Sequence, residues 1–110
     1  MKNYGFIRTA AAVPVVRIAD TEHNAAEICR LAGEAFGKKV SLVVFPKLSL
    51  TVYSCGDLFA MNPLVKGAED GIKKILEFSR GKAMTIVVGA PVPYRSRLYD
   101  CAVVIRNGNV

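Results

Sequence analysis

The chain has 110 residues, of which 52% are hydrophobic, and a formal net charge of +6 at pH 7. This apolar content excludes a disordered chain, and no apolar run reaches the ~20 residues that a membrane span needs. The first residues lack the apolar segment of a signal peptide, so we expect a cytoplasmic protein. The positive charge is divided evenly between the two halves of the chain. That distribution favours a solvated basic surface over a nucleic-acid interface.

Cysteine and histidine are too few and too widely spaced for a disulfide framework or a zinc site. The cysteines are Cys29, Cys55 and Cys101, and the only histidine is His23. Cys29 has the helical spacing of a core residue, so we interpret it as a buried thiol. His23 falls in the first turn of a predicted helix and is interpreted as a surface or capping residue. We expect no metal.

A strand and a helix are predicted first. Residues 4–13 are small and apolar, which is typical of a strand buried on both faces. Asp20 or Thr21 can cap the helix that follows, and Gly37 is expected to end it. One face of this helix collects the apolar residues Ala25, Ile28, Cys29, Ala32, Ala35 and Phe36.

A second strand and a second helix follow. Residues 41–45 are continuously apolar, as in a buried parallel strand, so a β-α-β unit is complete by this point. Its carboxyl end, residues 46–49, is where such folds place their chemistry. Residues 49–62 are expected to form a loop with one helical turn. The second helix then starts at Asn62-Pro63 and ends at Gly81.

Two further strands are predicted at 84–88 and 97–106, joined through a hairpin-like connection. Asn107-Gly108 is a strong signal for a two-residue turn, which predicts a returning strand beyond it. The predicted order is therefore β-α-β-α-β-β within one α/β unit over residues 1–110.

Three stretches carry a resemblance to a known family. Residues 42–59, Leu-Val-Val-Phe-Pro-Lys-Leu-Ser-Leu-Thr-Val-Tyr-Ser-Cys-Gly-Asp-Leu-Phe, resemble the strand, Phe-Pro-Glu and Thr-Gly-Tyr signature of nitrilase-superfamily amidases. Their Ser-Cys-Gly-Asp-Leu-Phe extension is similar to the glutamine amidase domain of glutamine-dependent NAD synthetases. Residues 4–14 and 98–105 resemble that family's first strand and its Leu-Tyr-Asn-Cys-Ala strand.

The resemblance implies an α-β-β-α sandwich, of which this chain supplies the N-terminal portion. It also implies a glutamate base, a lysine and a nucleophilic cysteine that hydrolyse glutamine to provide ammonia for NAD synthesis. Lys47 stands at the position of the glutamate and Val52 at the glycine of Thr-Gly-Tyr. The family's lysine and cysteine are expected beyond Val110. ATP and Mg²⁺ are implied only for a separate synthetase domain.

Lys47 is therefore the one candidate site residue. An ammonium group has no lone pair with which to accept the thiol proton, so the chain is expected to be inactive alone. The alternative interpretation of Lys47 is a solvated loop lysine. Cys55 is not interpreted as the nucleophile, because no histidine or carboxylate has a clear spacing to serve as its base. Tyr53 and Asp57 are expected to fix the loop.

Three hypotheses about the whole chain remain. The first is a portion of a glutamine-dependent NAD synthetase amidase domain. The second is a non-catalytic α/β module that dimerises or binds a partner through an exposed sheet. The third is a basic nucleic-acid-binding domain. Since a single sheet of a sandwich leaves an apolar face open, we expect self-association or a partner that covers this face.

Overall fold

The computed structural model describes residues 7–17, 20–46, 62–94 and 97–110, and its elements follow the predicted order. Neither helix in these ranges is long and apolar enough to cross a membrane. The predicted β-α-β-α-β-β succession is confirmed. The elements are β1 (Thr9–Ala11), α1 (Thr21–Gly37), β2 (Leu42–Val44), α2 (Asn62–Ser79), β3 (Thr85–Tyr94) and β4 (Arg97–Arg106).

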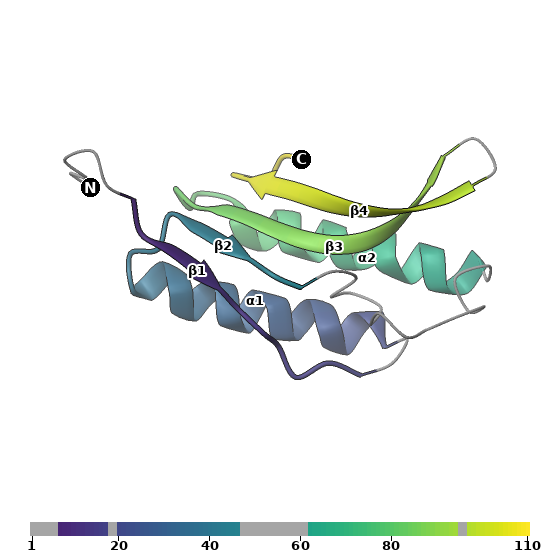
Figure 1. Ribbon diagram of the computed structural model, residues 1–110, viewed down its shortest axis with the longest axis horizontal. Coiled ribbons are helices and arrows are strands. Elements are labelled where there is room, and N and C mark those ends of the chain that lie inside the picture. Colours follow the sequence, from purple (N-terminus) through teal and green to yellow (C-terminus); the bar gives the residue numbers. More distant parts are fainter. Residues whose placement is uncertain (1–6, 18–19, 47–61, 95–96) are drawn as a thin grey trace.

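The strands form one sheet in the order β1-β2-β3-β4 (Figure 1). The first three run parallel and β4 returns antiparallel to β3, as expected for the hairpin. β2 pairs with only the first three residues of β3, ending at Val44↔Val87. Pro91 and Pro93, which lack an N–H, occupy the part of β3 beyond this pairing. Their nitrogens lie an even number of residues from that of Thr85, which donates to the carbonyl of Ser41 on the β2 side, so they point away from β4 and cost no ladder bond.

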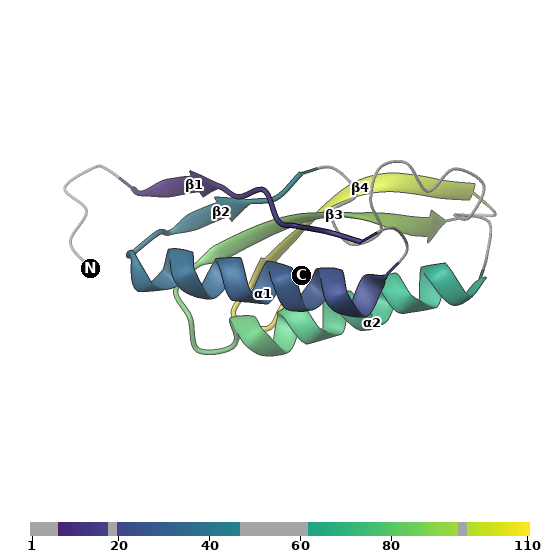
Figure 2. The ribbon, with the colours of Figure 1, turned by 90° about the horizontal axis from the view of Figure 1, so that it is seen from below.

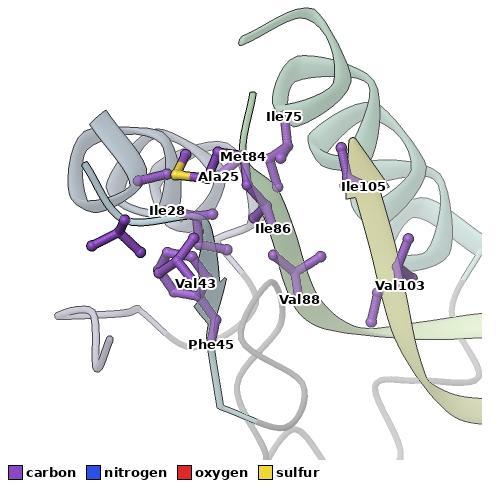
Figure 3. Close-up of a cluster of buried hydrophobic side chains, with 13 residues drawn as sticks. Ala25, Ile28, Val43, Phe45, Ile75, Met84, Ile86, Val88, Val103 and Ile105 are labelled. Carbon is purple, nitrogen blue, oxygen red and sulfur yellow. The ribbon is translucent and has the colours of Figure 1, made fainter. Parts of the chain in front are cut away.

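Both helices pack on the same face of the sheet (Figure 2). Burial alternates along β3 as far as Val88 and along β4 from Ala102 to Arg106, because successive side chains point to opposite faces. Figure 3 shows the resulting core, in which the helices and strands meet. Its labelled members are Ala25, Ile28, Val43, Phe45, Ile75, Met84, Ile86, Val88, Val103 and Ile105.

The opposite face of the sheet is not covered by any described element. Val44 is 41% exposed and Val104 is 50% exposed. The pairings Ala11↔Val44, Val44↔Val87 and Val87↔Val104 place these side chains in one apolar row across all four strands. The prediction that the first two strands are buried on both faces is therefore wrong. Both strands have one face covered by the helices and one face uncovered. The uncovered face of the sheet is here called the open face.

The ends of α1 follow the sequence only in part. Asp20 is the cap, and its carboxylate accepts a hydrogen bond from the backbone N–H of His23 at 3.0 Å. The helix ends at Gly37 as predicted, but Gly37 is its last helical residue, and the left-handed residue beyond it is Lys39, with φ 61°. Phe36, expected on the apolar face, is 40% exposed.

The C-terminal end of α2 is fastened to the turn after β4. Asn107 and Gly108 both have positive φ, and Arg106 pairs with Asn109, which confirms the predicted two-residue turn. The buried Ser79 hydroxyl accepts from the N–H of Gly108 at 2.8 Å. The side-chain oxygen of Asn107 accepts from the N–H of Gly81 at 2.9 Å. These two bonds fix the turn against the helix.

Candidate active-site edge

The carboxyl ends of the parallel strands meet at one edge of the sheet, where the sequence places the candidate chemistry. The N–H of Ala12 donates to the carbonyl of Val44 at 2.9 Å, and the N–H of Phe45 donates to the carbonyl of Val87 at 2.9 Å. β2 is therefore held on both sides up to the point where the chain enters residues 46–49. Backbone bonds and the buried side chains of Val43 and Phe45 thus order the strand that leads into this segment.

Small, apolar residues border this edge. If the register of Val44 with Val87 continued for two residues, Pro46 would be level with Gly89. Gly89, Ala90 and Pro91 are all buried. The described residues at the three carboxyl ends, 12–16, 44–46 and 88–92, include no acid, histidine or cysteine. The described part of the edge thus shapes a site without supplying a reactive group.

One functional feature that the sequence analysis missed is the role of Asn24. This side chain is fully buried, accepts from the N–H of Arg17 at 2.8 Å and donates to the carbonyl of Arg17 at 2.8 Å. It holds the segment that leaves the carboxyl end of β1 against α1. Nε2 of His23 also lies 3.1 Å from the carbonyl oxygen of Val15. A polar residue four positions before Ile28, on the apolar face, was the available signal.

The predicted site residue Lys47 lies outside the described residues. The same holds for Val52, Tyr53, Cys55 and Asp57. The roles assigned to them remain predictions. What the structure describes is the framework on which they depend, namely the end of β2 and its two neighbours.

The titratable groups that the structure describes do not form a second reactive centre. Burial raises the pKa of the Cys29 thiol, which makes it a poorer nucleophile at neutral pH. Its half-buried position against the core agrees with the predicted structural role. The hydrogen bond from Arg30 lowers the pKa of Glu27, and this pair lies on the surface of α1. In the described ranges, no group of three metal-ligating side chains comes together.

Comparisons with known proteins now assign the family. Residues 8–110 match the carbon-nitrogen hydrolases. The chain is 38% identical over 106 residues to the glutamine-dependent NAD⁺ synthetase of Mycobacterium leprae, covering 96% of this chain and 16% of that protein. It is 30% identical over 93 residues to the synthetase of Aquifex aeolicus, covering 84% of this chain and 16% of that protein.

Solved structures agree with this assignment. A glutamine-dependent NAD⁺ synthetase from Cytophaga hutchinsonii superposes with a TM-score of 0.80 at 28% identity, covering 94% of this chain and 17% of that one. An amidase from Nesterenkonia sp. superposes with a TM-score of 0.81 at 19% identity, covering 94% of this chain and 40% of that one, and so shows the shared fold. The chain thus spans about a sixth of the length of the synthetases that it matches, and it belongs to the carbon-nitrogen hydrolase family.

Proposed function

We propose that this chain forms part of the glutamine-hydrolysing amidase domain of a glutamine-dependent NAD synthetase. Its similarity to the mycobacterial synthetases over nearly all of its length carries the proposal. In that role the domain releases ammonia from glutamine. ATP and Mg²⁺ would serve the synthetase domain and would have no ligands in this part. The strands described here would supply the sheet edge at which glutamine is attacked.

Lys47 is the feature that limits this activity. It follows the end of β2 by three residues, at the position of the family's general-base glutamate. At neutral pH its ammonium cannot accept a proton from a thiol. Nor can it pass a proton to the departing ammonia as a carboxylic acid does. We therefore infer that a complete domain carrying Lys47 hydrolyses glutamine very poorly.

A graft tests both statements. Residues 8–110 of this chain replace the matching segment of an active glutamine-dependent NAD synthetase, either unchanged or with Lys47→Glu. The Lys47→Glu graft should hydrolyse glutamine at least about 10²-fold faster than the unchanged graft, which is the size of a general-base contribution. NAD formation from free ammonia, with ATP and Mg²⁺, is the control for folding and should be equal in the two. Equal glutamine hydrolysis by both grafts would refute the role of position 47.

The open face supports a second candidate function, an interaction module. Val44 and Val104 point away from the helices and are 41% and 50% exposed. Val13 and Val15, which follow β1 in the chain, are 82% and 75% exposed. Soluble monomers rarely expose contiguous apolar surface of this kind. A second copy with the same open face could cover it by stacking sheet on sheet, as sheets do at about 10 Å.

Sedimentation at micromolar concentration tests this candidate. The unmodified chain should sediment as a dimer, and Val44→Lys with Val104→Lys should dissociate it, because two charges would be buried in the contact. Ala26→Lys, an exposed position on α1, is the matched control for an added lysine and should leave the dimer intact. A monomer at these concentrations would exclude self-association.

A further inference from the structure

The end of the sheet opposite the candidate active site gathers basic side chains that are distant in sequence. The N–H of Ser41 donates to the carbonyl of Arg8 at 2.8 Å, and the N–H of Thr85 donates to the carbonyl of Ser41 at 2.9 Å. Thr85 also pairs with Arg106 on β4. Arg8 and Arg106 are therefore brought to the same end of the sheet, in adjacent rows, with the Arg8 side chain on the helix face and that of Arg106 on the open face. Lysines occupy the turns that lead into β2 and β3. The basic end is defined by Arg8, Lys38, Lys39, Lys82 and Arg106.

Neutral acceptors hold three of these cations in place. Arg8 Nη1 donates to the carbonyl of Lys38 at 2.8 Å. Lys82 Nζ donates to the carbonyl of Phe78 at 2.6 Å and lies 4.2 Å from the centre of its ring. Arg106 Nη1 donates to the hydroxyl of Thr85 at 3.1 Å. These bonds order the side chains but leave their positive charge uncompensated.

Carboxylates near the C-terminal ends of both helices are engaged with other arginines. Glu77 pairs with Arg80 at 3.1 Å, and Glu34 pairs with Arg30 at 3.1 Å. Among the described residues, no ion pair is formed by any member of the basic end. The C-terminal ends of α1 and α2 contribute roughly half a negative charge each. About one negative charge against five cations leaves a strongly positive surface.

The basic end spans the width of the sheet, which is three inter-strand spacings or about 14 Å, and an exposed aromatic ring adjoins it. Phe36, at the last turn of α1, is 40% exposed, and its carbonyl accepts from the N–H of Lys39 at 3.0 Å. Arginine and aromatic residues together are typical of protein interfaces. Phosphate contacts of a duplex nucleic acid would use the charge but would leave the phenyl group uncovered.

We propose that the basic end, together with Phe36, is a docking surface for an acidic segment of another polypeptide that carries an apolar side chain. The segment lies across the end of the sheet, so that its carboxylates meet Arg8 and Lys39 and, on the open-face side, Arg106. Its apolar side chain covers Phe36. The surface lies about 13 Å from the carboxyl edge, which is the rise of four residues along β1 from Arg8 to Ala12. Docking there leaves the candidate active site free.

The probe is a short fluorescent peptide of alternating glutamate and glycine with one central phenylalanine, and anisotropy with the full chain measures its affinity. Arg8→Gln with Lys39→Gly removes two charges, and glycine readily adopts the φ of 61° at position 39. We expect a loss of roughly 2- to 20-fold, the range for two exposed ion pairs. Lys66→Gln with Lys73→Gln is the control, because it removes the same charge from exposed positions on α2. The control should lose less than about twofold.

Two further measurements separate this surface from its alternatives. Lys38→Gln with Arg106→Gln leaves the Arg8 hydrogen bond in place and should weaken binding to a similar extent. Phe36→Ser should weaken the phenylalanine peptide but not a matched peptide with glycine at that place. Equal losses in the basic-end pairs and in the control would overturn the proposal. Tighter binding of random duplex DNA with the same variant pattern would also overturn it, in favour of a nucleic acid.

Discussion

Replacing Asn24 by alanine removes the side chain that fixes the chain between β1 and α1. Both hydrogen bonds to the backbone of Arg17 are lost, each 2.8 Å long in the native structure. A net hydrogen bond contributes about 1 kcal/mol, and an orphaned group costs about 1–3 kcal/mol. Since Arg17 is exposed, its backbone N–H and C=O can form hydrogen bonds with water after the substitution. The cost of the orphaned groups therefore falls at the lower end of the about 1–3 kcal/mol range. We expect a loss of about 2 kcal/mol in the free energy of unfolding.

Urea denaturation of the chain and of Asn24→Ala measures this loss at neutral pH. For a chain of this length, about 2 kcal/mol corresponds to roughly 8–10 °C in melting temperature. Asn24→Gln is the matched variant, with the same amide one methylene further out, and it should recover only part of the stability. A loss below about 0.5 kcal/mol for Asn24→Ala would refute the reasoning, because the two bonds would then contribute less than ordinary surface contacts.

Asn24→Asp adds a test of the direction of the hydrogen bonds. The carboxylate can still accept from the N–H of Arg17, but it faces the carbonyl that the amide used to satisfy. Burial of the new carboxyl group raises its pKa above the unfolded value. A proton is then bound more tightly in the folded state, so the deficit relative to Asn24 should shrink as pH falls from neutral towards ~4. A deficit that grows with falling pH would contradict this assignment.

Two predictions concern the packing of the helices. A methyl group on Gly67 would lie 2.5 Å from Oγ1 of Thr21, so Gly67→Ala should cost about 1–3 kcal/mol. Gly33, where the nearest atom is 3.6 Å away, is the matched control and should gain up to about 1 kcal/mol in helix propensity on changing to alanine. Ser79→Ala leaves the Gly108 N–H without its buried acceptor and should cost about 1–2 kcal/mol. The midpoints of urea denaturation measure both losses of stability. An unchanged midpoint for Gly67→Ala or Ser79→Ala would contradict the corresponding contact.

The succession of elements could be predicted because each element has its own hydrophobic period. The cap at Asp20 and the turn at Asn107-Gly108 were readable for the same local reason. Whether the strands are buried on one face or on both could not be predicted from the sequence. A short apolar run such as 41–45 does not show whether one face or both faces are covered. Val44 is open because no described element packs over it, and that depends on the tertiary arrangement.

The basic end could not be recognised from the sequence either. Positive charge is spread evenly over the sequence, yet Arg8 and Arg106 are brought to the same end of the sheet by the backbone bonds through Ser41 and Thr85. The left-handed conformation of Lys39 could not be read from its residue type, because glycine and asparagine are the usual signals. Lys47, in contrast, was identified by a motif alone, and its surroundings were not predictable from composition or spacing.

The two ends of the sheet carry separate proposals and should respond separately to substitution. Sites more than about 7–10 Å apart without shared partners usually contribute additively, and the basic end is about 13 Å from the carboxyl edge by the rise of β1. Within the graft, Lys47→Glu should restore glutamine hydrolysis without changing affinity for the acidic peptide. Arg8→Gln with Lys39→Gly should weaken the peptide without changing hydrolysis. If either substitution altered both readouts, the sheet would couple its two ends, and neither could be treated as an independent site.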